Sequence, residues 1–259
     1  MRNIRLKVAY DGTNYHGFQR QHVSYGPTIQ GTLEAVWKKL FDEEPVIATA
    51  GRTDAGVHAL GQVVNLLTEA KIPEEKIPKA CNSLLPRDIR ILKADSVSED
   101  FNARWSATWK RYDYYIDNNP IQDVFRRLYT AHVPVVLNIK KMQDAGSFLE
   151  GRHNFKTFAA VGGNSKTFER TLFRCQVKED NRFIKVVCVG DGFLYHMVRI
   201  IVGTLIDVGR GRISPQEIPA IIASQERRRA RLIAPASGLT LIHVNYSEES
   251  PFEVFPDLV

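Results

Sequence analysis

The stretch VIATAGRTDAGVHALGQVVNLL, residues 46–67, decides how the first half of the chain folds. Val46–Ala50 and Leu60–Leu67 are apolar and rich in β-branched residues, so the pattern predicts two strands. The run Gly51-Arg52-Thr53-Asp54-Ala55-Gly56 between them predicts a loop, because glycine tolerates backbone turns that other residues resist. A single carboxylate, that of Asp54, is therefore expected in a glycine-bounded loop between two strands.

The sequence on both sides of this stretch completes an alternating pattern. Apolar residues spaced as on a helix, each about one turn after the last, follow the cap candidate Thr28, and Pro45 is expected to end that helix. A weaker helix is predicted over Pro73–Leu85, and strands over Ile4–Tyr10 and Ile89–Val97. The order strand, helix, strand, strand, helix, strand predicts an α+β unit of ferredoxin type.

The second half repeats this order loosely. Strands are predicted over Arg111–Ile116, Thr171–Val177, Phe183–Val189 and Leu239–Tyr246, and helices over residues 138–149, with Asn138 as cap, over Phe193–Val208, and after the capping box of Ser214 and Glu217. We therefore expect an α+β fold of two ferredoxin-like halves, residues 1–107 and 108–259, with mainly antiparallel sheets that flank a basic cleft.

Charge is distributed unevenly along the chain. Of 259 residues, 35 are Lys or Arg and 29 are Asp or Glu, for a net charge of +6. Residues 108–231 alone carry 21 basic and 12 acidic side chains, or +9, whereas residues 1–107 are nearly balanced at 14 and 13. A basic region of this kind suits a polyanionic partner such as nucleic acid, although a solvated basic surface would give the same count.

Other features exclude several classes of protein. There is no apolar run long enough for a transmembrane helix and no secretory signal at the N-terminus, so a cytoplasmic protein is expected. Cys81, Cys175 and Cys188 are too few and too scattered for a disulfide framework. No phosphate-binding GxxxxGK[ST] or GxGxxG loop and no metal-ligand spacing occur, so the sequence gives no support for nucleotide-driven chemistry.

The acidic residue in the glycine-bounded loop is the first candidate for chemistry. A carboxylate held in such a loop can be desolvated and aimed, as a nucleophile or a base requires. An ordinary Asp-containing turn is the alternative interpretation. His58, which follows the loop, is expected to be structural, because no other ligand has metal spacing around it.

The predicted helix Phe193–Val208 carries the second candidate. This helix is apolar nearly all round, which is typical of a buried helix. Arg199 within it would be a costly charge unless a carboxylate pairs with it or its side chain reaches the surface. If Arg199 is buried, Asp54 is a natural partner.

An ordered series of motifs over nearly the whole chain resembles the TruA family of tRNA pseudouridine synthases. The run Gly51–His58 looks like the signature of this family. The other matching segments are Tyr10-Asp11-Gly12 with Tyr15, Gly17, Gln19 and Gln21; Asn82 with Leu85-Pro86 and Asp88-Ile89; Phe101 with Ala103-Arg104; Lys110-Arg111-Tyr112 with Tyr114; Phe155 with Phe158; His196–Arg199 with Ile201-Val202-Gly203; and Gly238-Leu239.

The resemblance implies a reaction and roles for particular residues. The family isomerises uridine in tRNA to pseudouridine, without a cofactor, by moving the ribose from N1 to C5 of uracil. Asp54 would be the catalytic carboxylate, attacking C6 of the base or the anomeric carbon, or abstracting a ribose proton. Tyr112 would stack on the target base, Arg199 would pair with Asp54, Arg52 would help to extrude the nucleotide, and Leu239 would pack under the uracil.

The resemblance also implies the substrate and the assembly. Family substrates are uridines at tRNA positions 38, 39 and 40 in the anticodon stem-loop, and the family works as a homodimer with one tRNA spanning both subunits. Neighbouring sites of different sequence require recognition of RNA shape and phosphates rather than base edges. The expected RNA-binding residues are Lys110, Arg111, Arg126, Arg127, Arg227, Arg228 and Arg229, with Arg231 beside them.

Two other classes of protein stay open on the residues alone. A non-catalytic RNA-binding protein with tandem ferredoxin-like halves would share the basic and aromatic strands, but it gives no reason for a pair of Asp54 with Arg199. A hydrolase with an aspartyl nucleophile, such as a phosphatase, would need further acids for Mg²⁺ near Asp54, and none cluster there in the sequence.

Overall fold

The computed structural model describes residues 1–21, 26–163, 165–180 and 182–258. The chain forms two compact units, Met1–Thr108 with Thr240–Tyr246, and Trp109–Leu239 with Ser247–Val259. The first division lies one residue from the boundary predicted between residues 107 and 108. The return of residues 240–246 to the first unit is not visible in the sequence pattern.

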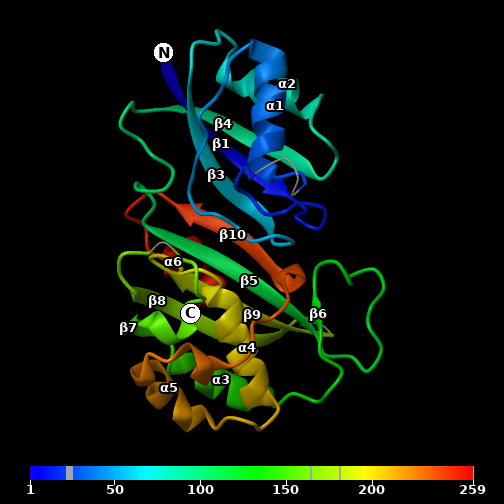
Figure 1. Ribbon diagram of the computed structural model, residues 1–259, viewed down its shortest axis with the longest axis vertical. Coiled ribbons are helices and arrows are strands. Elements are labelled where there is room, and N and C mark those ends of the chain that lie inside the picture. The colour runs from blue at the N-terminus through cyan, green and yellow to red at the C-terminus, as the bar shows by residue number, and fades with distance from the viewer. Residues whose placement is uncertain (22–25, 164, 181, 259) are drawn as a thin grey trace. The chain divides into compact units, whose positions relative to one another are not determined.

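The first unit is a mainly antiparallel sheet with two helices (Figure 1). Its strands lie in the order β4, β1, β3, β2, and each neighbouring pair is antiparallel, which is the ferredoxin arrangement. A further strand, β10, pairs parallel to β3. The elements are β1 (Arg2–Tyr10), α1 (Ile29–Phe41), β2 (Ala48–Thr49), β3 (His58–Thr68), a 3₁₀ turn η2 (Glu74–Lys76), α2 (Ile77–Asn82), β4 (Ile89–Val97) and β10 (Leu239–Asn245).

Local sequence explains most of these elements. Alternate residues of β1 are buried, as in a strand with one face in the core. Helix α1 begins where the Thr28 hydroxyl accepts a hydrogen bond from the Gly31 N–H, so the predicted cap is confirmed. The helix ends at Asp42, whose φ of 55° is left-handed, rather than at Pro45. The predicted strand Val46–Ala50 shortens to the two residues that pair with β3.

The second unit contains the antiparallel strands β5, β9, β8 and β7, in that order, with the short strand β6 parallel to β5. The order β5, α3, β8, β9, α4 along the chain follows the ferredoxin pattern. The elements are β5 (Trp109–Asp117), β6 (Ala131–His132), α3 (Ile139–Ser147), β7 (Gly151–Asn154), η3 (Phe155–Phe158), β8 (Glu169–Asp180), β9 (Phe183–Gly190), α4 (Met197–Gly209), η4 (Pro215–Glu217), α5 (Ile218–Ser224), η5 (Arg227–Ala230), η6 (Ala236–Gly238), α6 (Pro251–Val254) and η7 (Pro256–Leu258).

In this unit one predicted boundary is wrong and one short strand was missed. The helix predicted from Phe193 begins four residues later, because His196 has a left-handed φ of 59° and interrupts the helical backbone before Met197. The short strand β7 was not predicted, since its four residues show no alternation. The caps at Asn138 and at Ser214 are confirmed: Asn138 Oδ1 accepts from Lys141 N at 2.9 Å, and Glu217 Oε2 accepts from Ser214 N at 2.7 Å.

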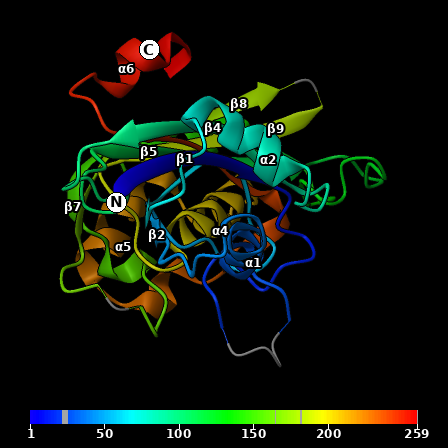
Figure 2. The ribbon, with the colours of Figure 1, turned by 90° about the horizontal axis from the view of Figure 1, so that it is seen from above.

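The end of the chain covers the sheet face that the helices leave open. Figure 2 shows α6 on one side of β5, β8 and β9, and α4 and α5 on the other. We call residues 247–258 the C-terminal strap. Leu258 is fully buried in a cluster with Trp109, Val187 and Val189, and Phe255 packs at its edge. The strap therefore supplies the second hydrophobic layer of this sheet.

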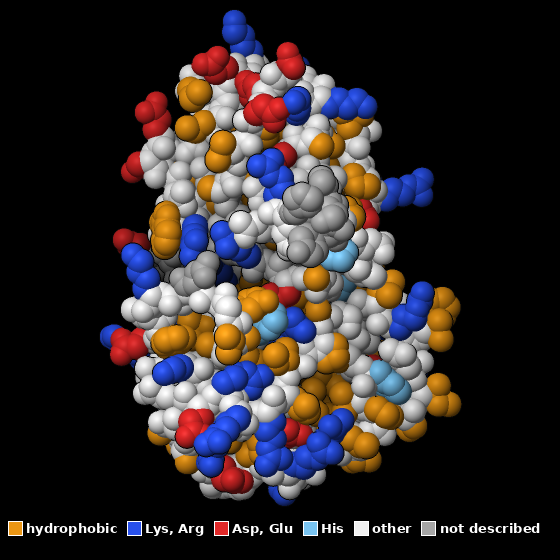
Figure 3. Space-filling view, in the orientation of Figure 1, with side chains coloured by type: hydrophobic (Ala, Val, Ile, Leu, Met, Phe, Trp, Pro, Cys, Tyr) orange, Lys and Arg blue, Asp and Glu red, His pale blue; other side chains and the backbone are white. Residues whose placement is uncertain are grey.

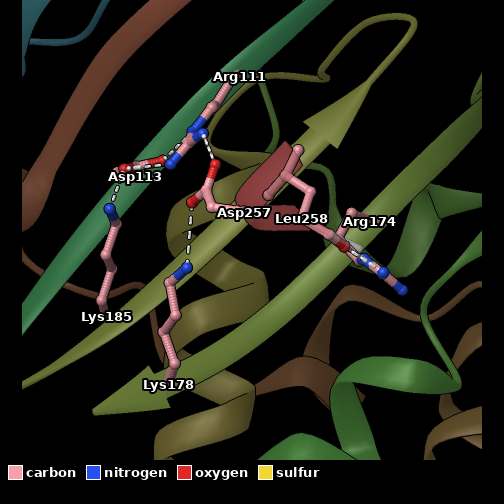
Figure 4. Close-up of polar contacts among 7 residues, drawn as sticks. All are labelled: Arg111, Asp113, Arg174, Lys178, Lys185, Asp257 and Leu258. Carbon is pink, nitrogen blue, oxygen red and sulfur yellow. Dashed lines mark hydrogen bonds and ion pairs between the residues drawn. The ribbon is translucent and has the colours of Figure 1, made fainter. Parts of the chain in front are cut away.

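Polar contacts fasten the C-terminal strap to the same face (Figure 4). The buried Arg111 guanidinium pairs with Asp113 at 2.8 Å and with Asp257 of the strap at 3.3 Å. Lys178 pairs with Asp257 at 3.1 Å. Arg174 Nε donates to the backbone carbonyl of Leu258 at 2.6 Å. Although burial alone would raise the pKa of Asp257, the hydrogen bond from Lys178 and the charge of Arg111 hold that pKa below its usual value.

The strap provides a test of the packing. Leu258→Ala is expected to lower the free energy of unfolding by about 2–4 kcal/mol, because it empties a fully buried site. Leu92→Ala, at a leucine that is 51% exposed, is the matched control and is expected to change stability by less than about 0.5 kcal/mol. Urea unfolding followed by circular dichroism measures both. Equal effects of the two substitutions would contradict the assigned role of the strap.

Candidate active site

Two side chains of the first unit, Tyr10 and Gln62, hold the loop that carries Asp54 by hydrogen bonds. The Tyr10 hydroxyl lies 2.7 Å from Thr53 Oγ1, and both groups are buried. Gln62 Nε2 donates to the carbonyl of Gly51 at 2.9 Å and to the Tyr10 hydroxyl oxygen at 3.3 Å. Because Gln62 donates to the Tyr10 oxygen, the proton of that hydroxyl is free to point at Thr53. The residue before Asp54 is thus fixed by a buried chain of hydrogen bonds.

The pKa of Tyr10 shows that its hydroxyl stays neutral. Burial raises the pKa of Tyr10 to about 12, and the hydrogen bonds with Thr53 and Gln62 offset the rise only in part. A raised pKa favours the neutral phenol, so the hydroxyl keeps its proton at every pH below about 12. Tyr10 therefore acts as an unchanging anchor for Thr53 through the physiological pH range.

The segment after β1 wraps over the same loop at close backbone distance. The Phe18 N–H donates to the Thr53 carbonyl at 3.0 Å. A side chain at Gly12 would place its Cβ 2.0 Å from the Val57 carbonyl oxygen, and one at Gly17 would lie 2.9 Å from that of Thr53. Glycine at both positions is therefore required for the approach of the two backbones. This explains why the Tyr10-Asp11-Gly12 and Gly17 parts of the opening motif occur together with Gly51–His58.

The residues of the loop itself differ in exposure. Thr53 and Val57 are buried, Asp54 is half-buried and Arg52 is exposed. The Asp54 carbonyl accepts from the Val57 N–H at 3.1 Å, which closes a tight turn around Ala55 and Gly56. The turn presents a carboxylate from a rigid backbone, as a catalytic group requires.

His58 has a structural position, as expected from the sequence. Its ring is buried, and Nδ1 accepts a hydrogen bond from the Gly12 N–H at 3.1 Å. Among the described residues, no group of three His, Cys, Asp or Glu side chains is arranged to hold a metal ion. The geometry therefore assigns His58 to the contact between the two backbone segments.

The second unit brings Arg199 close to two of its own elements. Arg199 Nε donates to the Ala234 carbonyl at 2.8 Å, and the Ala234 N–H donates back to the Arg199 carbonyl at 3.0 Å. Burial raises the pKa of Tyr114, and the nearby charge of Arg199 lowers it in part. The Tyr114 hydroxyl donates to the Pro235 carbonyl at 2.8 Å. Arg199 thus lies beside Tyr114 and the segment that leads to Leu239.

Tyr112 and Leu239 lie in ordered surroundings of the same unit. Tyr112, on β5, is buried and meets the Phe193 ring edge-on at a centroid distance of 5.1 Å. Leu239 is buried, and the backbone of Gly238 before it packs directly on the Tyr114 ring. Asp54 belongs to the first unit and Arg199 to the second, so their predicted ion pair stays a prediction.

The basic residues predicted to bind RNA fall into two groups. Arg126, Arg127, Arg228 and Arg229 are exposed, and Lys110 and Arg227 are half-buried. Arg228 pairs with Glu226 at 2.8 Å. Arg111 differs from these, because its buried guanidinium is occupied by Asp113 and Asp257 rather than presented at the surface. Arg111 and Asp113 lie two residues apart on β5 and therefore project from the same face of the strand.

Comparison with known proteins places this arrangement in a class of RNA-modifying isomerases. The sequence profile of the family described as "tRNA pseudouridine synthase" matches residues 7–106 and 145–247. Both the Asp54 loop and Arg199 lie within the matched ranges. The chain belongs to the tRNA pseudouridine synthase family.

Curated relatives match the chain from end to end. A protein named "tRNA pseudouridine synthase A" from Moorella thermoacetica is 47% identical over 243 residues, which are 94% of this chain and 99% of that protein. A protein of the same name from Acetivibrio thermocellus is 45% identical over 95% of this chain and 100% of its own length. A solved Cbf5–Nop10–Gar1 complex aligns over 94% of this chain and 50% of its own, with 13% identity and a TM-score of 0.38. That likeness is too distant to carry an argument.

The anchoring of the Asp54 loop can be tested at Tyr10. Tyr10→Phe removes the hydroxyl that holds Thr53 and leaves the ring in place, so the carboxylate next to Thr53 loses its fixed position. We expect kcat to fall by roughly tenfold or more, with the Kd for tRNA unchanged. Tyr246→Phe, which removes a hydroxyl bonded to the Ala103 carbonyl of the same unit, is the matched control and should keep kcat. Single-turnover assays and equilibrium binding separate the two quantities, and an equal loss in both variants would refute the anchoring role.

Proposed function

We propose that this protein isomerises uridine to pseudouridine in tRNA, with Asp54 as the catalytic carboxylate. The proposal rests on two observations together: the chain belongs to this family, and the structure around Asp54 holds its loop in place. The only acid within the Gly51–His58 signature is Asp54, and that signature is held rigid by Tyr10, Gln62 and the close approach of residues 12–18.

The reaction conserves every atom of the substrate. The bond from the ribose anomeric carbon to N1 of uracil breaks, the base rotates, and a new bond forms to C5. The proton on C5 leaves and N1 gains one, so nothing is oxidised or reduced and no co-reactant is consumed. Asp54 acts by adding to C6, by trapping the anomeric carbon, or by taking a ribose proton. Each of these routes requires an ionised and well-aimed carboxylate.

Four further side chains take supporting roles in this proposal. Arg199 pairs with Asp54 and orients its carboxylate. Tyr112 stacks on the target base, and Leu239 packs under the uracil. Arg52, exposed beside Asp54, helps to draw the nucleotide out of its stem. Family membership supports the assignment, as do the positions of Tyr112 on β5, Arg199 on α4 and Leu239 on β10.

The substrate and assembly follow from the same family. We assign the target uridines to tRNA positions 38, 39 and 40, a homodimer as the working unit, and the cytoplasm as its location. Phosphate contacts are assigned to Lys110, Arg126, Arg127, Arg227, Arg228 and Arg229, since these lie in the region of highest positive charge. Figure 3 shows Lys and Arg side chains over the part of the visible surface where the second unit lies in Figure 1. Among the described residues, no helix is both long and apolar enough to cross a membrane.

The catalytic assignment is tested by a neutral isostere. Asp54→Asn is expected to abolish pseudouridine formation in an unmodified tRNA transcript, while tRNA affinity stays within about tenfold because the phosphate contacts are retained. Asp42→Asn, at an exposed acid with left-handed backbone that Asn tolerates, is the control and should keep full activity. Reactions run in EDTA without added nucleotide test the absence of a cofactor. Turnover by pure Asp54→Asn protein would sink the assignment, and tRNA binding without turnover by the wild type would favour a non-catalytic RNA-binding protein.

The pair of Arg199 with Asp54 makes a separate prediction. Arg199→Met should reduce kcat by on the order of 100-fold, because the carboxylate loses the cation that orients it. The variant should still fold, since its neighbours in α4 are buried apolar residues. Arg199→Lys should recover only part of the activity, as an ammonium cannot reproduce a two-pronged guanidinium contact. Thermal melts check folding, and wild-type turnover by Arg199→Met would disprove the pair.

A further inference from the structure

Two neighbouring aromatic side chains that precede α4 are not used by the reaction proposed above. The Tyr195 and His196 rings stack on each other, with centroids 3.9 Å apart and ring planes 32° from parallel. Tyr195 is 44% exposed, whereas Leu194 before it and Met197 after the pair are buried. A single exposed aromatic residue is ordinary on a protein surface. A tyrosine whose ring rests on a second ring is, in addition, a preformed platform on which a further ring can stack.

The backbone of this pair is a tight turn in an unfavourable conformation. The Met197 N–H donates to the Leu194 carbonyl at 3.0 Å, which closes a turn with Tyr195 and His196 at its two central positions. His196 has a φ of 59° and a ψ of 9°, the left-handed region that favours glycine at this position of a turn. A glycine there would lack the ring that supports Tyr195. Backbone strain of this kind gathers at ligand sites, where a side chain is needed in one place.

The segment around residue 160 holds the stem of Tyr195. The Ala160 N–H donates to the Tyr195 carbonyl at 3.0 Å. A Cβ at Gly163 would lie 3.0 Å from Tyr195 Cβ, so the chain passes close to Tyr195 there. The backbone and Cβ of Tyr195 are thereby fixed, while nearly half of the residue stays open to solvent. A side chain that is already ordered loses little entropy when a ligand stacks on it.

The turn lies beside the residue assigned to stack on the target base. Phe193, two residues before Tyr195, meets the Tyr112 ring edge-on at a centroid distance of 5.1 Å. Arg199 follows His196 by three residues, about one turn along α4. A target base that reaches Tyr112 brings its neighbour in the RNA strand with it, because the two nucleotides share a phosphate. The Tyr195 platform is therefore in the neighbourhood that a flanking nucleotide must enter.

The charge near the turn suits an RNA strand. Arg170 lies against Gly192, where a Cβ would be 3.3 Å from Arg170 Nε. Arg170 Nη1 donates to the backbone carbonyl of Glu169 at 2.5 Å, and a carbonyl is a neutral acceptor that leaves the guanidinium its charge. The acid that follows Gly192 is Asp191 in reverse order along the chain, and its carboxylate accepts from the Thr171 N–H at 3.0 Å. A cation beside an open aromatic ring can bind an unpaired nucleotide, the cation through the phosphate and the ring through the base.

We propose that Tyr195, backed by His196, stacks on an unpaired base of the substrate RNA next to the target uridine. This inference rests on the proposed function, which supplies the RNA. Tyr195 binds the flanking nucleotide, and the isomerisation itself stays with Asp54. Because every base presents a π-face, a stacking contact accepts a neighbour of any sequence. That property matches an enzyme whose proposed targets lie at three positions in tRNAs of different sequence.

The first experiment separates the aromatic ring of Tyr195 from its bulk. Tyr195→Phe keeps the aromatic face, and Tyr195→Leu fills space without it. We expect the kcat/KM and tRNA affinity of Tyr195→Phe to stay within about twofold of wild type, and those of Tyr195→Leu to fall on the order of tenfold, the loss of one base stack. Phe148→Leu, at an aromatic residue that is 39% exposed at the end of α3, is the matched control and should change neither quantity. Unchanged thermal melts exclude misfolding.

Photo-cross-linking locates the stacked base directly. An anticodon stem-loop with 5-iodocytidine on either side of the target uridine should cross-link to Tyr195, identified by mass spectrometry of the RNA-linked peptide, and Tyr195→Leu should lose that link. An equal fall in affinity for Tyr195→Phe and Tyr195→Leu would assign the effect to the hydroxyl and overturn the stack. Wild-type affinity and kinetics in Tyr195→Leu would overturn it as well. A protein that cross-links RNA at Tyr195 but converts no uridine would retain the stack and refute only the proposed function.

Discussion

The close approach of residues 12–18 to residues 53–57 is the constraint on which the first unit depends. Two backbones meet there without side chains between them, because a Cβ at Gly12 or Gly17 would overlap a carbonyl of the Asp54 loop. The same contact is fastened by Tyr10, which reaches Thr53 from the end of β1. Strand β1, the loop and β3 are consequently held together, and the Asp54 carboxylate is carried by this framework rather than by a free turn.

In the second unit, the main constraint is that one face of the sheet must be covered. A ferredoxin-like sheet has helices on one face and leaves the other open, and here the C-terminal strap closes it with Leu258 and Phe255. Arg111 lies on the same face, where it pairs with Asp113 and with Asp257 of the strap. A buried charge of this kind is stable only because its carboxylate partners accompany it. Tyr112 and Tyr114 point to the other face of β5, so the contacts of Arg111 with the strap do not involve them.

The positions of Arg111 and His196 show where sequence reasoning stopped. Arg111 follows Lys110 directly, and a pattern of charges cannot distinguish a phosphate contact from an internal ion pair. The partner Asp257 is 146 residues away, so no local rule detects it. His196 lies inside an apolar run with helical spacing, yet its left-handed backbone delays α4 to Met197. The hydrogen bonds that link Tyr10, Thr53 and Gln62 could not be predicted for the same reason, since these residues come from three separate segments.

The sequence by itself determined the element order, the ferredoxin arrangement of the first unit, the caps at Thr28 and Asn138, and the family to which the chain belongs. These features depend on periodicity, on glycine and on contiguous motifs, all of which are local properties of the chain. Only the tertiary structure decided that residues 240–246 join the first unit, that Arg111 is buried, and that Phe125 and Val136 are exposed. Each of these depends on which distant residues meet, and that is set by packing and by pairing of buried charges rather than by neighbours in the sequence.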